Sequence, residues 1–214
     1  MVAVEECDVC HRPKPACVCD RVVTLETQRR VLILQHPQEK DALLGTAQLL
    51  EAMLPKAKVV VGLSWPNFAA AVGEEDADPK NWAVLFPDRD HPGNHVVDRR
   101  GRPMEPGALE GIIVLDGTWS KAKTLWWRNP WLVKMNRMSL APGKPSIYGR
   151  LRAEPRRELV STLESVGAAL TLAGESPDVQ KELERVFRTL VQRVRDAKLI
   201  PAPAARRDRN VTRR

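Results

Sequence analysis

Four consecutive residues, at positions 116–119, offer acid–base and binding chemistry. Asp116, Gly117, Thr118 and Trp119 follow the apolar run at 112–115, and a helix-like run at 120–128 comes next. An apolar run that is rich in β-branched residues is typical of a strand buried on both faces. In an open parallel sheet, ligands bind outside the carboxyl ends of the strands. We therefore expect the carboxylate of Asp116 to belong to a site rather than to the core.

All four cysteines lie in one short segment near the N-terminus, in the pattern C-x2-C-x6-C-x-C: Cys7, Cys10, Cys17 and Cys19. Two close pairs of thiolates on tight turns can supply the tetrahedral ligands of zinc, and a segment without a core of its own gains its fold from such a metal. Two disulfides or four reduced thiols are the alternatives. The sequence shows no secretion signal, which argues against disulfides. We therefore predict a structural zinc site.

Composition and charge limit the possible classes of protein. The chain has 214 residues, 43% of them hydrophobic, and a formal net charge of +7. No apolar run reaches the length of a membrane span, so we expect a cytoplasmic protein without a membrane partner. Residues 201–214 carry a net charge of +4 and have the composition of a disordered tail. This tail is either a solvated terminus or a loose electrostatic contact to nucleic acid.

Strand-like and helix-like runs alternate along the chain. We expect strands at 30–35, 59–63, 82–87, 112–115 and 133–140, and helices at about 43–54, 65–72, 120–128, 159–172 and 179–198. Residues 88–107 form a long loop without periodicity. The alternation predicts the α/β class with a largely parallel sheet. Neither a G-x-G-x-x-G fingerprint nor a P-loop is present.

Other polar and aromatic residues lie near the expected strand ends. His36 and Glu39 follow the strand at 30–35, where we favour a turn with a capping role for Glu39 over catalysis. Ser161 and Glu164 have the spacing of a capping box, and a helix N-terminus also binds a carboxylate or phosphate. Packing is the favoured role for the tryptophans at 126, 127 and 131, with 127 or 131 at a surface, although stacking on a base is an alternative.

Several short motifs together resemble the DTW-domain family, the tRNA-uridine aminocarboxypropyltransferases. They occur in the family's order between residue 7 and about residue 172. The motifs are Cys7-x-x-Cys10 with Cys17-x-Cys19, His36-Pro37-x-Glu39, Leu85-Phe86-Pro87, Asp116-Gly117-Thr118-Trp119, Ser146-x-Tyr148-x-x-x-Arg152 and Ser161-Thr162-x-Glu164. One departure is Gly149-Arg150-Leu151-Arg152, where the family has adjacent arginines, so either arginine is a candidate for RNA contact.

The resemblance implies a fold similar to the knotted SPOUT class. The chain would then comprise a four-cysteine zinc-binding segment at 1–25, a catalytic domain at 26–200 and the basic tail at 201–214. It also implies S-adenosylmethionine as the donor of its 3-amino-3-carboxypropyl group. The acceptor would be N3 of a uridine in the tRNA variable loop, and methylthioadenosine would be released.

Under this interpretation, the carboxylate of Asp116 takes the proton of N3 as the new bond forms. The helix start at Ser161 and Thr162 would hold the donor carboxylate, and Glu164 or Asp116 would pair with the donor ammonium. The expected donor-binding residues are Leu85, Phe86, Pro87, Leu115, Gly117, Thr118, Trp119, Ser161, Thr162 and Glu164, with Phe86 and Trp119 beside the adenine. The expected RNA-binding residues are Lys121, Tyr148, Arg150 and Arg152.

Three other functions are compatible with the same residues. One is a SPOUT-like RNA methyltransferase, and another is aminocarboxypropyl transfer to ribosomal RNA. The third is a zinc-bearing RNA-binding module without catalysis. Only the last of these predicts that Asp116→Asn leaves function intact.

Overall fold

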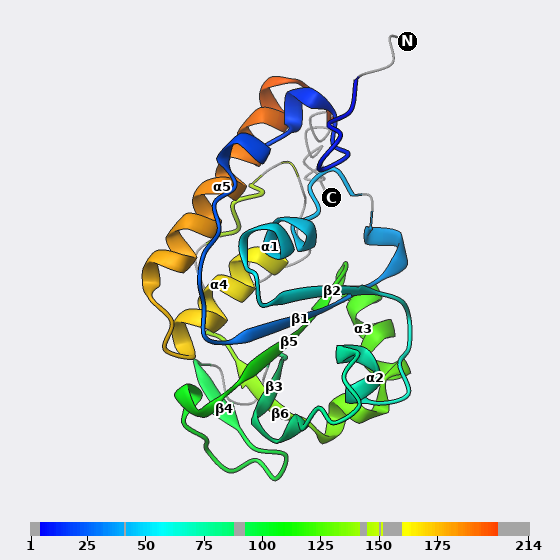
Figure 1. Ribbon diagram of the computed structural model, residues 1–214, viewed down its shortest axis with the longest axis vertical. Helices are drawn as coiled ribbons and strands as arrows, with labels where there is room; N and C mark the ends of the chain where they lie inside the picture. Colours follow the sequence, from blue (N-terminus) through cyan, green and yellow to red (C-terminus); the bar gives the residue numbers. More distant parts are fainter. Residues whose placement is uncertain are drawn as a thin grey trace, which may run out of the picture.

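The computed structural model describes residues 5–40, 42–87, 93–141, 145–149, 151 and 160–200. These residues form a six-stranded sheet in the order β2-β1-β5-β3-β6-β4, in which every neighbouring pair is parallel except β4 and β6 (Figure 1). The α/β class and the largely parallel sheet are therefore confirmed. The strands are β1 (Arg30–Gln35), β2 (Ala57–Val61), β3 (Trp82–Leu85), β4 (His95–Val97), β5 (Gly111–Asp116) and β6 (Asn136–Ser139).

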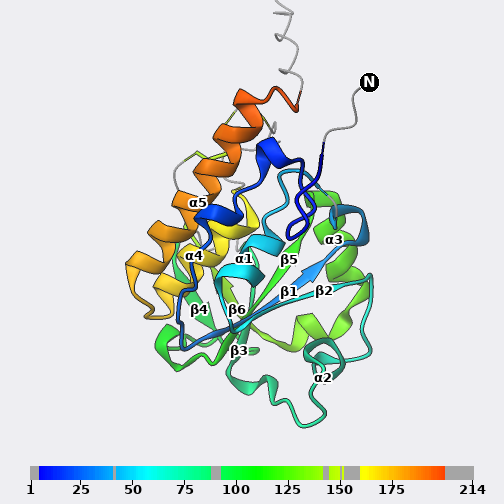
Figure 2. The same cartoon turned by 45° about the horizontal axis from the view of Figure 1, so that its top comes forward.

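Helices cover both faces of the sheet. They are α1 (Ala47–Met53), α2 (Phe68–Val72), α3 (Trp119–Arg128), α4 (Thr162–Leu172) and α5 (Pro177–Asp196). The core on one face includes residues of α1, α4 and α5, whereas α2 and the short helix η6 (Pro130–Lys134) contribute to the core on the other. Helices α4 and α5 accordingly lie on the opposite side of the sheet from α3 (Figure 2). Among the described residues, no helix is long and apolar enough to cross a membrane.

Two interior strands, β1 and β5, are buried on both faces, as their apolar runs predict. Along β1, Val31 and Ile33 belong to the core beneath α1, α4 and α5, whereas Leu32 and Leu34 belong to the opposite core. This alternation follows from the period of two in a β-strand, and burial on both faces requires apolar residues at every position. The first polar residue in β1 after Arg30 is Gln35, at its carboxyl end.

The parallel register fixes which polar residues meet at the sheet edge. Gln35, the last residue of β1, is the register partner of Asp116, the last residue of β5. The N–H of His36 then donates to the carbonyl oxygen of Asp116 over 3.0 Å. The two strands therefore end together, and a carboxylate and a carboxamide lie side by side where a ligand of a parallel sheet is expected.

Several elements of the chain differ from the sequence-based expectation. The strand expected at 133–140 is divided into η6 and β6, because Pro130 begins a tight turn and Leu132 and Met135 pack into the core. The loop expected at 88–107 contains the three-residue strand β4, which pairs antiparallel with β6. The strand expected at 59–63 starts two residues earlier, at Ala57.

Candidate active site and cysteine cluster

Asp116 is the centre of a small hydrogen-bonded group at the carboxyl end of β5. Its side chain is buried, and the residue is 8% exposed. The carboxamide Nε2 of Gln35 donates to Oδ2 of Asp116 over 2.8 Å, and the hydroxyl of Thr162 donates to Oδ1. Each carboxylate oxygen therefore accepts a hydrogen bond from a different element, β1 or α4, and these two contacts contribute to the orientation of the carboxylate.

The N-terminus of α4 is capped by side chains from its own first turn. Ser161 and Glu164 form the predicted capping box: the Ser161 hydroxyl accepts from the N–H of Glu164, and the Glu164 carboxylate accepts from the N–H of Ser161. Glu164 also accepts from the Ser146 hydroxyl over 2.8 Å and from the N–H of Ile147 over 2.9 Å. The carboxylate of Glu164 thus attaches the 146–147 turn to α4, next to Thr162.

Helix α3 begins differently, because no side chain caps it. Its N-cap residue is Thr118, whose side chain makes no cap hydrogen bond and is exposed. Gly117 permits the close approach of the chain here, since a Cβ atom at this position would lie 2.9 Å from Cβ of Lys121 and 3.5 Å from Cβ of His36. An uncapped helix N-terminus favours a negatively charged group. The start of α3 is therefore better suited to an anion than the start of α4.

The aromatic and apolar residues expected at the donor site lie on neighbouring strand ends. Phe86, directly after β3, stacks on Trp126 with ring centres 4.2 Å apart, and its N–H donates to Met138. Leu85 packs against the core beneath α4 and α5, and Leu115 packs against the opposite core. Pro87 is exposed and Trp119 is half-buried. Two surface hollows lie elsewhere, one lined by Arg30 and Lys58 and the other by residues that include Cys17; neither is lined by Asp116.

The residues expected to contact RNA have different surroundings. Lys121 forms an ion pair with Glu39 over 2.7 Å, in a partly buried position. Tyr148 is 2% exposed, its hydroxyl donates to the carbonyl of Leu44 over 2.9 Å, and its ring packs edge-on against Phe187. This position gives Tyr148 a packing role instead of a surface for RNA. Arg150, Arg152 and the basic tail lie outside the described residues.

The turn after β1 is present, but its cap differs from the expectation. The helix η3 (Pro37–Glu39) follows the strand, and Nδ1 of His36 accepts from the N–H of Gln38 over 3.2 Å. The cap is therefore made by His36, whereas Glu39 pairs with Lys121. This ion pair joins the end of β1 to the first turn of α3.

The four cysteine sulfurs form one cluster. Their Sγ atoms all lie within 4.8 Å of one another, and those of Cys7 and Cys19 are 3.9 Å apart. All four cysteines are free thiols. A tetrahedron with zinc–sulfur bonds of about 2.3 Å has edges of about 3.8 Å, so the cluster is close to the size that zinc requires. The arrangement fits a metal such as zinc, and it fits the soft thiolate donors that zinc prefers.

The thiols of the cluster have unequal acidities. Hydrogen bonds from the backbone N–H groups of Cys10 and Val9 lower the pKa of the Cys7 thiol to about 6. Burial raises the pKa of Cys17 and of Cys19. Cys7 is therefore more readily converted than Cys17 or Cys19 to the thiolate that a metal binds, because the ligating form of cysteine is the deprotonated one.

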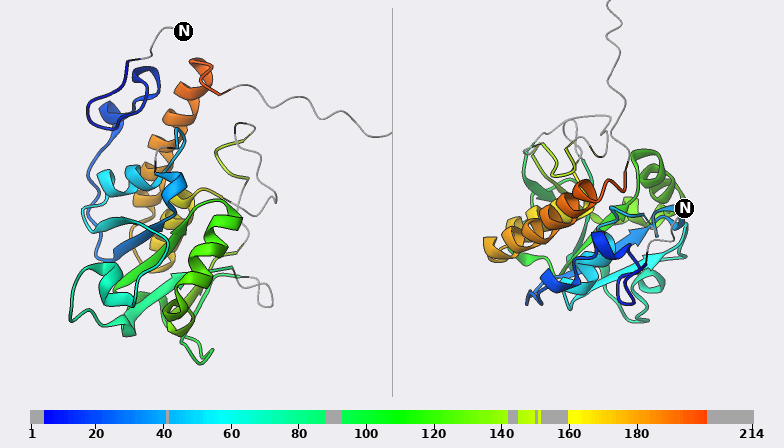
Figure 3. Two further views of the ribbon diagram at one scale, coloured as in Figure 1. Left: turned by 90° about the vertical axis from the view of Figure 1, so that its right-hand side faces the viewer. Right: turned by 90° about the horizontal axis from the view of Figure 1, so that it is seen from above.

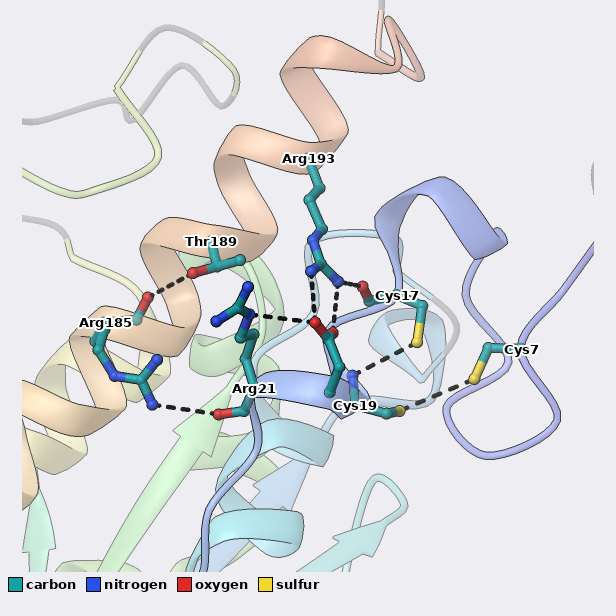
Figure 4. Close-up of polar contacts among 8 residues, drawn as sticks. Cys7, Cys17, Cys19, Arg21, Arg185, Thr189 and Arg193 are labelled. Carbon is teal, nitrogen blue, oxygen red and sulfur yellow. Dashed lines mark hydrogen bonds and ion pairs between the residues drawn. The ribbon is translucent and has the colours of Figure 1, made fainter.

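The cysteine segment is attached to the rest of the molecule and does not form a separate body. It runs alongside α5 (Figure 3), and Ala16 and Val18 belong to the main core. Arg193 of α5 donates to the carbonyl of Cys17 and forms a two-pronged contact with Asp20 at 2.7 and 2.8 Å (Figure 4). Hydrogen bonding from Arg193 lowers the pKa of the Asp20 carboxyl to about 2.

Sequence reasoning missed two residues that position the site. The sequence marks Gln35 only as the end of a strand, yet it donates to Asp116, and a polar residue closing a buried strand was the available signal. Arg12 lies inside the cysteine segment, is 5% exposed and donates to the carbonyl oxygens of Leu43 and Gly45. Its signal was weak, because arginines in loops are usually solvated.

Comparison with known proteins gives a consistent family. The model of the DTW domain matches residues 4–195. The chain is 28% identical over 190 residues to tRNA-uridine aminocarboxypropyltransferase 2 of Drosophila melanogaster, an alignment that covers 86% of this chain and 73% of the fly protein. It is 29% identical over 199 residues to the protein of the same name from Macaca fascicularis.

The macaque alignment covers 86% of this chain but 62% of the macaque protein, so this chain spans less than two thirds of that relative. The corresponding protein of Mus musculus is 27% identical over 197 residues. No solved structure matches this chain. Because the family model covers nearly the whole length of the chain, including the cysteine cluster and the Asp116 site, the chain belongs to the DTW domain family.

Proposed function

We propose that this chain is a tRNA-uridine aminocarboxypropyltransferase. It transfers the 3-amino-3-carboxypropyl group of S-adenosylmethionine to N3 of a uridine in the tRNA variable loop. The relatives that carry this activity in their names support the reaction class and the tRNA substrate. The single structural observation behind the proposal is the buried carboxylate of Asp116, held by Gln35 and Thr162 at the carboxyl end of a central parallel strand.

Asp116 acts as the general base. N3 of uracil is a weak nucleophile while it carries a proton, and a carboxylate within hydrogen-bond reach removes that proton as the N3–carbon bond forms. The contacts from Gln35 and Thr162 keep the carboxylate from rotating, so its orientation is set before the substrates arrive. The sulfonium donor supplies an electrophilic methylene group and leaves as the neutral thioether methylthioadenosine.

The uncapped start of α3 holds the donor carboxylate in this proposal, in place of the start of α4 at Ser161 and Thr162 that was expected from the sequence, because the start of α4 is already capped. Thr118 contributes an exposed hydroxyl, and the helix dipole favours the negative charge. Glu164 is a positioning residue in this scheme, because its carboxylate already accepts hydrogen bonds from Ser146, Ile147 and Ser161. Phe86 and Trp119 lie beside the adenine, and Leu85, Pro87, Leu115 and Gly117 shape the surrounding strand ends.

Three further features belong to the same proposal. Zinc occupies the cluster of Cys7, Cys10, Cys17 and Cys19 in a structural role, away from the chemistry. The fold is of the knotted SPOUT class, and the protein acts in the cytoplasm. Arg150 and Arg152 contact the RNA.

The test uses purified tRNA and two forms of S-adenosylmethionine, labelled either in the methyl group or in the carboxypropyl carbons. The native protein should place only the carboxypropyl label in tRNA. Asp116→Asn is the matched variant, because its amide oxygen still accepts a hydrogen bond from Gln35. It should lose about 100- to 10,000-fold in rate, as expected for the loss of a general base, while its affinity for tRNA is retained.

Each alternative function has its own outcome. Transfer of the methyl label would show that the protein is a methyltransferase. Labelling of purified ribosomal RNA in place of tRNA would show that ribosomal RNA is the substrate. Full activity of Asp116→Asn would remove Asp116 from the mechanism. If the native protein binds tRNA but transfers neither label, it is a non-catalytic RNA-binding module.

A further inference from the structure

Outside the basic tail at 201–214, positive charge is concentrated in one stretch of the chain, residues 117–153. This stretch has eight lysines and arginines and no aspartate or glutamate, whereas the whole chain has 34 basic and 27 acidic residues. The rest of the chain therefore has 26 basic and 27 acidic residues, a net charge of −1. The acid-free stretch starts directly after Asp116 and includes the whole of α3.

Helix α3 combines part of this charge with an exposed aromatic ring. Trp119, Lys123 and Trp127 follow one another at intervals of four residues, which places them along one side of the helix. The ammonium of Lys123 lies 5.9 Å from the centre of the Trp119 ring. In the described part of the chain, Trp127 is the one aromatic residue among the large exposed hydrophobics, with 75% of its surface exposed. Trp127 lies about 13 Å along the axis of α3 from Thr118, the N-cap residue of the helix.

Four exposed cations of α3, η6 and β6 are not neutralised by carboxylates of the described residues. Lys123, Arg128, Lys134 and Arg137 are exposed, and none of them has an ion pair with any residue that the structure describes. Lys121 differs, because its ammonium pairs with Glu39. A group of cations without acidic partners attracts a polyanion, which releases its own counterions on binding.

The end of α3 that carries Trp127 is held firmly in place. The side chain of Asn129 is fully buried; it accepts from the N–H of Trp65 over 2.8 Å and donates to the carbonyl oxygens of Leu63 and Leu125. The indole N–H of Trp131 donates to the carbonyl of Trp65 over 3.1 Å. An aromatic ring on such a fixed support loses little conformational entropy when it binds a ligand.

We propose that Lys123, Trp127, Arg128 and Lys134 form a binding surface for unpaired tRNA nucleotides, which we call the α3 surface. An unpaired base stacks on the indole of Trp127, while the basic side chains contact the flanking phosphates. The proposal rests on the proposed tRNA substrate and assigns the face of the molecule that receives it. A second copy of this chain fits less well, because a two-fold interface would bring the same positive surface against itself.

The test measures binding of unmodified tRNA to the full chain, without donor, at several salt concentrations. Trp127→Ala should weaken binding about 5- to 150-fold, the equivalent of one lost base–aromatic stack. Trp127→Phe keeps an aromatic face and should stay within about 3-fold of the native affinity. Lys123→Gln and Lys134→Gln should each lower the slope of log K against log salt by about one. Lys181→Gln, an exposed lysine on α5, is the matched control and should change neither quantity.

Two results would overturn the α3 surface. One is a Trp127→Ala variant that binds tRNA as tightly as the native protein. The other is a Trp127→Ala variant that has a different number of subunits from the native protein in light scattering and keeps native tRNA affinity. In that case the surface would join two copies of the chain. Failure of the proposed function has a different signature: tRNA binding would depend on Trp127 while the native protein formed no aminocarboxypropyl-uridine, a result that supports the surface alone.

Discussion

Replacing Gln35 with leucine removes one donor from the buried carboxylate of Asp116 and keeps a side chain of similar size. Gln35 is 1% exposed, and its Nε2 lies 2.8 Å from Oδ2 of Asp116. A hydrogen bond to a charged group contributes about 1.5–3 kcal/mol. We expect Gln35→Leu to lower the free energy of unfolding by this amount, which for a chain of 214 residues lowers Tm by about 3–12 °C.

A double-mutant cycle with Asp116→Asn isolates the contribution of this contact. The new amide accepts the same hydrogen bond without a charge, and a neutral hydrogen bond contributes about 0.5–1.5 kcal/mol. The cost of Gln35→Leu should therefore be about 1–1.5 kcal/mol smaller in the Asp116→Asn background. Urea unfolding of the four proteins measures the difference, provided that the dependence on urea has the same slope in all four.

The same replacement should also slow product formation. A base that is no longer held in line loses about 10- to 100-fold in rate, while tRNA affinity stays native because Gln35 lies inside the protein. The reasoning is refuted if Gln35→Leu changes the free energy of unfolding by less than about 0.5 kcal/mol, or if its cost is equal in both backgrounds. In either case the carboxylate of Asp116 would be oriented by other contacts.

Three further variants test other parts of the structure. Cys17→Ser, or treatment with a chelator, should lower Tm and release about one zinc ion per chain; native protein that holds no metal and is insensitive to chelator would contradict the zinc site. Tyr148→Phe removes the hydroxyl that donates to the carbonyl of Leu44 and should lower the free energy of unfolding by about 1–2 kcal/mol. Its tRNA affinity should stay native; a loss of tRNA affinity without a loss of stability would support a contact between Tyr148 and RNA. Gly117→Ala places a Cβ atom 2.9 Å from Cβ of Lys121 and should lower the free energy of unfolding in urea by about 1–3 kcal/mol. Thr118→Ala is the control and should change it little, because the Thr118 side chain makes no cap hydrogen bond. Equal stabilities of the two variants would argue against the close approach at Gly117.

The interior strands β1 and β5 were predictable because burial on both faces leaves a simple pattern. The apolar run from Arg30 to Gln35 has the bounds of β1, and the run before Asp116 lies within β5. The capping box of Ser161 and Glu164 was predictable for a similar reason, since it depends on residues three positions apart. Patterns of this kind are local, so they require no knowledge of what packs against them.

Contacts that depend on register were not predictable from the sequence. Gln35 and Asp116 are 81 residues apart and meet only because β1 and β5 are parallel neighbours with these residues paired. The burial of Tyr148 was unpredictable for a similar reason. It depends on the contacts of the 146–147 turn with Glu164, which bring the ring into the core. β4 was missed because a three-residue strand is too short to show alternation.

One loop, residues 43–46, connects the cysteine segment to the Asp116 site. Arg12 of that segment donates to the carbonyl oxygens at positions 43 and 45, at 3.3 and 2.7 Å. The hydroxyl of Thr46 accepts from the N–H of residue 163, next to Thr162, whose own hydroxyl donates to Asp116. These contacts form a continuous path from the cysteine segment to the donor of the Asp116 carboxylate, so the two parts of the molecule are packed through the same loop.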